Sequence, residues 1–460
     1  MKLTSLTAIS PIDGRYSDVT VLLRNIFSEF SFFKYRLYVE IQWFKKIMSM
    51  SQTLKINFFE HKKLFLLDEI INNFNENDAI CIKKIEKKTN HDIKALEYFL
   101  KKQVLKLDFF ESVSEFIHFG CTSEDINNIA YALMLKDARD QIILPLWYDI
   151  IHALKKMMIQ HQYVSLLSLT HGQPATPSTM GKEIANFYYR MKRQYKKLKK
   201  IEILAKMNGT TGNYNAHLAA YPNINWHTIS KEFVTSLGIN WNPYTTQIEP
   251  HDYIAELFSC VCLFNTILIN FNRDIWGYIS LDYFHQKLKD CEIGSSIMPH
   301  KVNPIDFENS EGNLGLSNAL MNHMIMKLPI SRWQRDLSDS TVLRNLGVAI
   351  SYSIISYHSV LLGVNKLRIN KDRILEMLNQ HWSILSEPIQ TVMRRYGIKN
   401  GYEKLKEITR GKKIDKSIIH DFISQLNIPE NEKIRLQNIN PENYIGNASQ
   451  TINEMINDIN

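Results

Sequence analysis

Hydrophobic side chains recur at helical spacing through the middle of the chain. Between residues 254 and 275 they follow one another at steps of three and four, at Ile254, Leu257, Phe258, Val261, Phe264, Leu268, Phe271 and Ile275. The segment 184–198 repeats the pattern at Ile184, Phe187, Tyr188, Met191, Tyr195 and Leu198. Stripes of this length with little proline or glycine inside predict a bundle of long helices.

The predicted bundle helices also carry apolar residues off the main stripe, such as Ile267, Ile269 and Ile203. A helix that is apolar over more than half its circumference has neighbours on several sides, so we expect subunits to associate through the bundle. The stretches Leu257–Phe271 and Val348–Val364 are shorter than the roughly 20 residues of a membrane span and contain polar side chains. We therefore interpret them as buried bundle helices, with no membrane contact.

Polar segments with proline or glycine divide the chain at residues 10–16, 170–178, 208–213 and 294–304. Beyond about Leu367 the apolar stripes become shorter and more charged, which predicts a small terminal domain. At roughly 150 residues per domain, 460 residues give about three domains. We place them at residues 1–119, 120–366 and 367–460.

The composition is that of a folded globular chain, with 45% hydrophobic and 22% charged residues, which excludes a disordered or collagen-like protein. The net charge of +8 is compatible with anionic small molecules or weak nucleic-acid contact and requires neither. The Lys-rich segment 192–200 predicts a solvated helix face with no nucleic-acid site. A basic helical RNA-binding scaffold is the alternative from another class.

The five cysteines, at positions 81, 121, 260, 262 and 291, contain no C-x-x-C pair and cannot form a disulfide framework. Cys260 and Cys262 lie in an apolar helical run, so we expect buried thiols and no metal site. The first residues, Met1–Ser5, lack the apolar run of a signal peptide. Together these features lead us to expect a protein of the reducing cytoplasm.

Several common catalytic motifs are absent from the sequence: the P-loop, the Rossmann glycine fingerprint, H-E-x-x-H and the G-x-S-x-G elbow. The densest polar cluster is the loop Gly294–Pro304, in which small residues precede a proline, a cation and an amide. Such a loop can close over a ligand and place a hydroxyl beside an ammonium group. That pair suits removal of a carbon-bound proton with stabilisation of the resulting charge. The alternative is a mobile surface loop that caps a helix.

Two further clusters contain groups suited to acid–base chemistry and anion binding. His171 lies in the turn Thr170–Thr176, which contains a glycine and a proline, and the ordinary pKa of an imidazole, near 6.5, suits proton transfer at neutral pH. In His118–Asp125, a Thr-Ser pair precedes acidic residues, which predicts a helix start whose N–H groups and hydroxyls can bind a carboxylate. A structural histidine and ordinary helix capping are the alternatives.

Other polar positions complete the set of candidates: Asn90, His91 and Asp92, then Gln247, and finally the segment Arg335–Arg344. Arg335 and Arg344, with Ser340 between them, have the residue types that seat a phosphate. Ion pairs on a helix surface are the alternative for these two arginines.

The run G-S-S-x-M-P-x-K-x-N at residues 294–303 resembles the signature of the fumarase/aspartase superfamily, whose members eliminate fumarate from succinyl-bearing substrates. Together with residues 10–16, 89–92, 118–125, 170–176 and 333–344, in this order, it is similar to the longer bacterial type of the adenylosuccinate lyase family. The similarity runs from end to end.

This resemblance implies an all-α, three-domain fold whose central long helices form the twenty-helix core of a homotetramer, with each active site shared between subunits. It implies cleavage of adenylosuccinate to AMP and fumarate, and of the succinylated imidazole-carboxamide ribotide to its free amine and fumarate. No metal or organic cofactor is implied, and the partners are small nucleotide substrates and further copies of the chain.

The resemblance also implies roles for individual residues. Ser295 corresponds to the general base that acts on the succinyl β-carbon, and His171 to the general acid that protonates the departing nitrogen. The implied substrate-binding residues are Arg15, Tyr16, Asn90, His91, Asp92, Thr122, Ser123, Gln247, Lys301, Asn303, Arg335, Ser340 and Arg344. His118 and Glu308 are implied as supporting residues, with Glu308 a partner that orients a histidine.

One position departs from the family pattern, because Leu169 stands where the family usually has an arginine. The change removes a cation close to His171 and leaves the acid and the base in place. Sibling lyases that act on argininosuccinate, aspartate or malate are the nearest alternatives. The two arginines around Ser340 and the Arg15-Tyr16 pair favour a nucleotide substrate over a bare diacid.

Overall fold

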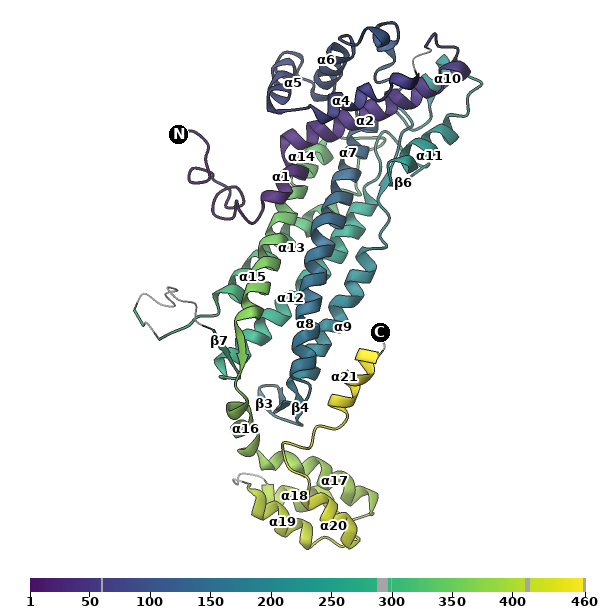
Figure 1. The fold of residues 1–460 in the computed structure, drawn as a ribbon. Helices are drawn as coiled ribbons and strands as arrows, with labels where there is room; N and C mark the ends of the chain where they lie inside the picture. Colours follow the sequence, from purple (N-terminus) through teal and green to yellow (C-terminus); the bar gives the residue numbers. More distant parts are fainter. Residues whose placement is uncertain (59–60, 288–296, 299, 410–413, 458–460) are drawn as a thin grey trace. The chain divides into compact units, whose positions relative to one another are not determined.

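The computed structural model describes residues 1–58, 61–287, 297–298, 300–409 and 414–457. Within these ranges the chain is predominantly helical, and its strands are two or three residues long (Figure 1). The predicted helical fold class is therefore confirmed. The stripes predicted from residues 184–198 and 254–275 lie in α9 (Met180–Leu198) and α12 (Asp252–Ser280).

The helices that precede the long bundle helices are α1 (Val21–Phe27), α2 (Glu29–Ser49), α3 (Ser51–Leu54), η1 (His61–Lys63), α4 (Leu66–Asn72), α5 (Glu76–Thr89), α6 (Asp92–Val104), η2 (Asp108–Phe116), α7 (Ser123–Asp137) and the π-helical η3 (Ala138–Ile143). The remaining helices are α8 (Leu144–Gln160), α10 (Asn215–Ala220), α11 (Trp226–Ser236), α13 (Ile305–Lys327), α14 (Ser338–Leu343), α15 (Leu346–Lys366), α16 (Lys371–Asn379), η4 (Trp382–Leu385), α17 (Ser386–Arg395), α18 (Gly401–Thr409), α19 (Lys416–Ser424), α20 (Glu430–Gln437) and α21 (Ala448–Asn457).

The strands form small two-stranded pairs beside the helices. The pairs β1 (Ser165–Leu166) with β4 (Ser178–Thr179), β2 (Leu169–Thr170) with β3 (Gln173–Pro174), and β7 (Phe284–Gln286) with β8 (Leu367–Ile369) are antiparallel. The pair β5 (Leu204–Ala205) with β6 (Asn240–Trp241) is parallel.

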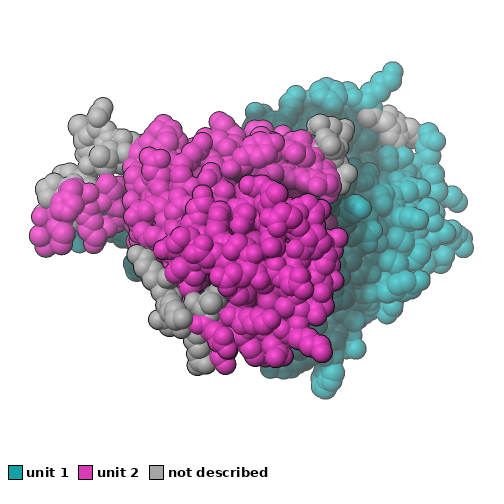
Figure 2. Space-filling model, turned by 90° about the horizontal axis from the view of Figure 1, so that it is seen from below, with its two compact units in different colours: residues 1–147, 194–266, 312–358 teal, residues 148–193, 267–311, 359–460 magenta. Residues whose placement is uncertain are grey.

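The chain divides into two compact units, which Figure 2 colours separately. Unit 1 contains residues 1–147, 194–266 and 312–358, and unit 2 contains residues 148–193, 267–311 and 359–460. Each unit therefore combines segments that are far apart in the sequence. The division into domains at residues 1–119, 120–366 and 367–460 stays a prediction.

Local side-chain caps fix the starts of several helices in unit 1. The Ser28 hydroxyl accepts a hydrogen bond from the Ser31 backbone N–H (3.2 Å) at the start of α2. At the start of α5, Asn75 and Asp78 form a reciprocal capping box. Each cap satisfies N–H groups that have no partner inside the helix, which sets where the helix begins.

The interior of unit 1 combines aromatic packing with buried polar contacts. The rings of Trp147 and Phe264 stack with centroids 3.8 Å apart. Beside them, Asn265 accepts a hydrogen bond from the Tyr357 hydroxyl (2.6 Å) and donates one to Ser353 (2.9 Å). Buried polar groups that are paired in this way avoid the cost of an unsatisfied donor or acceptor.

Two of the described helical segments, Asp252–Ser280 and Ser338–Lys366, are long and apolar enough to cross a membrane by length and composition, with mean hydropathies of 1.8 and 1.4. In the folded chain 61% and 56% of these apolar windows are buried. Polar side chains of these segments pair with one another in the interior, as Asn265 does with Ser353 in unit 1, and such pairing is typical of core helices. Both observations favour the interpretation as bundle helices.

Unit 2 has its own aromatic interior. Phe271 packs edge-on against Phe187 and Phe307, with ring centroids 5.4 and 6.5 Å apart. Asn272 on the same helix donates a hydrogen bond to Ser310 (2.9 Å). These contacts hold α9, α12 and α13 together inside unit 2.

Candidate active site

The start of α7 in unit 1 presents two of the predicted carboxylate-binding hydroxyls. Thr122 is the residue before the helix, and its backbone N–H donates to Oδ2 of Asp125 (2.8 Å). Thr122 and Ser123 are partly exposed, whereas Glu124 and Asp125 are buried. The first turn therefore leaves Thr122 and Ser123 partly exposed and buries both carboxylates, at the helix start that the sequence predicted.

Arg335 joins two other predicted residues to this helix start. Its Nη2 lies 2.8 Å from Oε2 of buried Glu124, and its Nη1 donates to Oε1 of Gln247 (3.2 Å). Burial raises the pKa of Glu124, and the Arg335 guanidinium opposes that rise. The side chains of Arg335 and Gln247 are thus held together next to Thr122 and Ser123.

A second ion-pair cluster forms around Asp92. Buried Arg36 donates to its Oδ2 at 2.7 Å, and Nη2 of Arg344 lies 3.5 Å from the same oxygen. Burial of Asp92 favours its neutral form, but the Arg36 and Arg344 guanidinium groups outweigh burial and hold its pKa below the usual value. Asp92 therefore carries a negative charge that orients both arginines.

The neighbours of Asp92 shape the turn between α5 and α6. Asn90 ends α5 in the left-handed region at φ 52°, a conformation that asparagine tolerates better than most residues. Nδ1 of His91 accepts a hydrogen bond from the Lys94 backbone N–H (3.1 Å) at the start of α6. In this structure His91 therefore acts as a helix cap, through Nδ1.

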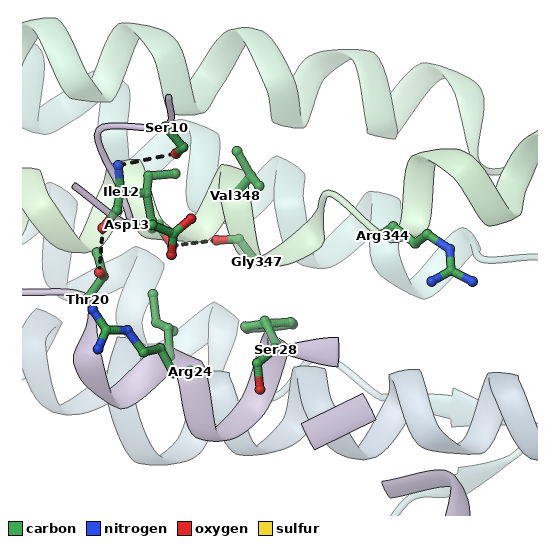
Figure 3. A pocket seen from close by; sticks show the side chains of 12 residues that line it. Ser10, Ile12, Asp13, Thr20, Arg24, Ser28, Arg344, Gly347 and Val348 are labelled. Atoms are coloured by element: carbon green, nitrogen blue, oxygen red, sulfur yellow. Dashed lines mark hydrogen bonds between the residues drawn. The ribbon is translucent and has the colours of Figure 1, made fainter. Parts of the chain in front are cut away.

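A pocket of about 210 Å³ lies next to Arg344 (Figure 3). It is lined by Ser10, Ile12, Asp13, Thr20, Leu23, Arg24, Phe27, Ser28, Arg344, Gly347, Val348 and Ser351. The N-terminal loop covers it, held by the bond from the Thr20 hydroxyl to the Ile12 carbonyl (3.0 Å). Arg15 is exposed, and its guanidinium lies 6.0 Å from the Tyr16 ring centroid. The loop that carries the predicted pair Arg15 and Tyr16 thus lines the same pocket as Arg344, through Ser10, Ile12 and Asp13.

Ser340 lies next to a buried triad that the sequence analysis did not identify. Its backbone N–H donates to Oδ1 of Asp339 (2.6 Å), whose other oxygen lies 3.5 Å from Nε2 of His251. Nδ1 of His251 lies 3.8 Å from Glu249. The position of His251 directly after Glu249-Pro250, just before α12, is the only sequence signal for this triad.

The two candidate phosphate arginines have carboxylate partners in unit 1. Arg335 pairs with Glu124, and Arg344 pairs with Asp92 and with Glu29 (3.3 Å). This arrangement agrees with the alternative interpretation, in which the two arginines form ion pairs. It also fixes the orientation of both guanidinium groups. A bound phosphate would have to share them with the carboxylates.

His118 forms a short contact with a partner that the sequence analysis missed. Its Nδ1 lies 2.6 Å from Oε1 of Glu40, a side chain with no exposed surface. Burial lowers the pKa of His118, but the Glu40 carboxylate outweighs burial and raises it above the usual value. The signal in the sequence is a charged residue between Val39 and Ile41, inside an apolar helical run.

His171 occupies the turn of a tight hairpin in unit 2. The strands β2 and β3 pair Thr170 with Gln173, which leaves His171 and Gly172 as the two turn residues. Both have positive φ, 54° and 70°, the combination required by a type I′ hairpin turn. The imidazole is exposed, and the nearby Leu169 is 39% exposed.

The remaining candidates lie around the start of α13 in unit 2, and Ser295 lies outside the described residues. Lys301 is exposed, and Asn303 is partly buried just before the helix. Oε1 of Glu308 accepts a hydrogen bond from Nε1 of Trp276 (3.1 Å). Glu308 therefore contacts a tryptophan, and the described residues provide it with no histidine contact.

The structure thus brings the predicted residues of unit 1 into two groups. Gln247 and Arg335 gather at the start of α7, and Asp92 and Arg344 gather at the start of α6. His171, Lys301, Asn303 and Glu308 belong to unit 2. Sequence reasoning missed the buried partners that fix these groups, namely Arg36, Glu40, Glu124, Glu249, His251 and Asp339.

Comparison with known proteins places the chain in a family. A family model described as Lyase matches residues 14–317, and one described as Adenylosuccinate lyase C-terminal matches residues 331–445. The chain is 75% identical to the adenylosuccinate lyase of Buchnera aphidicola subsp. Acyrthosiphon pisum, over 99% of this chain and 100% of that protein. It is 60% identical to the adenylosuccinate lyase of Escherichia coli K12, with the same coverage.

Two solved structures share the fold at low sequence identity. The fumarate lyase of Mesorhizobium sp. BNC1 superposes with a TM-score of 0.76 at 17% identity, covering 95% of this chain and 97% of that one. The 3-carboxy-cis,cis-muconate lactonizing enzyme of Pseudomonas putida gives 0.73 at 18% identity, covering 95% and 96%. The fold and the full-length sequence identity agree: the chain belongs to the adenylosuccinate lyase family.

Proposed function

We propose that this chain cleaves adenylosuccinate to AMP and fumarate, and the succinylaminoimidazole-carboxamide ribotide to its aminoimidazole-carboxamide ribotide and fumarate, in purine biosynthesis. The observation that carries this proposal is 75% identity over the whole length of a protein named adenylosuccinate lyase. The arginine-rich groups of unit 1 support a substrate with several negative charges, because guanidinium groups bind phosphate and carboxylate well.

The reaction is a β-elimination that needs two proton-handling groups. A base removes a proton from the succinyl β-carbon, the electron pair forms the C=C bond of fumarate, and the C–N bond breaks. An acid then protonates the departing nitrogen. We assign the base to Ser295 and the acid to His171, whose exposed position in the hairpin turn leaves its ring accessible to a ligand.

The charge that develops on the carboxylate next to the β-carbon has to be stabilised in the transition state. We assign this role to the ammonium of Lys301 and the amide of Asn303. In the proposed site, Thr122, Ser123 and Gln247 hold the succinyl carboxylates. The nucleotide contacts come from Arg15, Tyr16, Asn90, His91, Asp92, Arg335, Ser340 and Arg344, with His118 and Glu308 as supporting residues.

We further propose that the working enzyme is a cytoplasmic homotetramer whose sites combine residues of several subunits. Large apolar side chains on the bundle helices support association: Tyr189 on α9, Leu263 and Trp276 on α12, Leu316 on α13 and Leu362 on α15 are each about half exposed in the single chain. Exposed apolar surface of this kind marks protein–protein contacts. The described thiols of Cys81, Cys121, Cys260 and Cys262 are free, in agreement with a reducing compartment.

The test is an elimination assay with both succinyl substrates. We expect absorbance near the purine band to change as fumarate appears, and the variants Ser295→Ala and His171→Gln to lose turnover. His152→Gln, at an exposed histidine of α8, is the matched control and should keep normal activity.

Release of fumarate from argininosuccinate alone would instead identify a sibling lyase. Salt-dependent RNA binding without fumarate release would support the RNA-binding scaffold. Either result would contradict the proposal.

A further inference from the structure

Asp125 is a fully buried carboxylate beside the predicted succinyl-binding residues, and the proposed reaction gives it no role. Its oxygens accept hydrogen bonds from three backbone N–H groups, those of Thr122 (2.8 Å), Asn208 (2.9 Å) and Gly209 (3.1 Å). The ammonium of Lys206, also without exposed surface, lies 3.0 Å from Oδ1. One side chain therefore joins the start of α7 to the segment 206–209.

Lys206 and Asn128 complete the connection between these two segments. The Lys206 ammonium donates to the Gly209 carbonyl (2.9 Å). The Asn128 side chain accepts from the Lys206 backbone N–H (2.8 Å) and donates to the Lys206 carbonyl (3.1 Å). The Lys206 backbone groups thus have defined partners on α7.

The same segment reaches the irregular segment 245–247, which ends at Gln247. The Asn208 amide donates to the Thr245 hydroxyl (2.7 Å), two residues before Gln247. Gly212 approaches this segment so closely that a Cβ there would lie 2.4 Å from the Thr245 carbonyl oxygen. The distance between the α7 hydroxyls and Gln247 is therefore set through Asp125, Asn208 and Thr245.

A buried ion pair is weak evidence for stability, because removing both charges from water costs about as much as their attraction returns. Its advantage is that it defines geometry, since the hydrogen bonds of Asp125 are made only when the start of α7 and the segment 206–209 take one arrangement. The loop 208–213, which the sequence analysis identified only as an interruption, contacts Asp125 on one side and Thr245 on the other.

We propose that Asp125 and Lys206 are a positioning pair that fixes the spacing between Thr122, Ser123 and Gln247, and so makes this part of the site specific for a four-carbon dicarboxylate. The inference rests on the proposed function. Neither Asp125 nor Lys206 touches the substrate in this proposal. They act through the groups that they hold.

The experiment separates the two halves of the substrate by measuring inhibition by fumarate and by AMP in the same preparation. For Asp125→Asn we expect the fumarate inhibition constant to rise at least ~10-fold, as expected when one charged hydrogen-bonded arrangement is lost. AMP inhibition should change less than ~2-fold, because the ion pair that holds Arg335 on Glu124 does not involve the Asp125 side chain. The value of kcat should fall about 10²-fold, as for small misplacement of a reacting group.

A second variant keeps the test informative if Asp125→Asn does not fold. Thr245→Val removes the hydroxyl that accepts from Asn208 at a partly exposed position and leaves the ion pair intact. It should weaken fumarate inhibition selectively and to a smaller extent. The double variant Asp125→Asn with Lys206→Gln should be no worse than Asp125→Asn alone, because both changes break one coupled pair.

Ser353→Ala is the matched control, since it breaks a buried polar contact with Asn265 elsewhere in unit 1. It should lower stability and leave the ratio of fumarate to AMP inhibition unchanged. Equal loss of both inhibitors in Asp125→Asn and Thr245→Val, or no loss of either, would overturn the positioning role. If the unmodified chain released no fumarate from adenylosuccinate, the proposed function itself would fail, and the inference with it.

Discussion

The pair of His118 and Glu40 predicts a stability difference that depends on pH. The contact is 2.6 Å long, the carboxylate has no exposed surface, and the imidazole is 16% exposed. The pKa of His118 is raised above its usual value because the Glu40 carboxylate outweighs the effect of burial. The charged pair therefore stabilises the folded state fully below the unfolded pKa of about 6.5, and this contribution is lost as pH rises through the raised folded pKa.

Glu40→Gln is the informative change, because glutamine keeps the size of the side chain and an oxygen acceptor but removes the charge. A hydrogen bond to a charged group contributes about 1.5–3 kcal/mol, and one between neutral groups about 0.5–1.5 kcal/mol. The expected loss is therefore about 1–2 kcal/mol near pH 6. At about 2–4 °C per kcal/mol for a large unit, the melting temperature should fall by about 2–8 °C.

Thermal unfolding of both proteins, at fixed protein concentration and heating rate, should show this difference across a pH series. We expect the largest gap at about pH 6 and a smaller gap above the raised pKa of His118, where the imidazole is neutral in both proteins. Glu232→Gln is the matched control, because it removes the charge from an exposed ion pair with Lys46 (2.7 Å). The control should shift little at any pH, as exposed pairs do.

A gap between the unmodified chain and Glu40→Gln that is constant with pH would refute this reasoning. A gap that widens toward alkaline pH would refute it more strongly, because it would mean that the Glu40 carboxylate favours the neutral imidazole.

Three further predictions concern the proposed reaction. Ser295→Ala should bind substrate with near-normal affinity and turn over at least ~10² more slowly, which single-turnover kinetics would measure; normal turnover would remove serine from the role of base. Leu169→Arg returns a cation close to His171 and should shift the acid limb of the pH–rate profile, whereas an unchanged profile would show that the position has no electrostatic effect. Arg344→Gln should raise the AMP inhibition constant at least ~10-fold, because it removes a guanidinium group of the proposed nucleotide site. Fumarate inhibition should stay unchanged, because Asp92 keeps its contact with Arg36 at 2.7 Å. An equal effect on both inhibitors would place Arg344 away from the nucleotide.

The long helices were predictable because their signal is local. Apolar residues at steps of three and four define one face over many turns, and α9 contains the whole segment 184–198 that the sequence analysis identified. The N-cap at Thr122 was predictable for the same reason, since residue type and spacing within four positions decide it. The short strand pairs were not predicted, because two-residue strands carry no periodicity.

The partners of the candidate site residues were not predictable in the same way. Glu40 and His118 are 78 residues apart, and Arg335 and Gln247 are 88 apart. No periodic pattern links such positions, so only the fold brings them together. A charge inside an apolar run, as at Glu40, shows that a buried partner must exist but leaves the partner unnamed.

The turn that carries His171 restricts the chirality of the residue at position 172 and not the size of its side chain. Gly172 has φ 70°, and among the described residues a Cβ built on it would find no atom within 4 Å apart from its own chain neighbours. A mirror-image alanine should therefore be accepted there, whereas an ordinary L-alanine should strain the hairpin by roughly 1–2 kcal/mol. Chemical synthesis or ligation with a D-residue would thus stiffen the presentation of the imidazole without crowding the space in which a ligand has to fit.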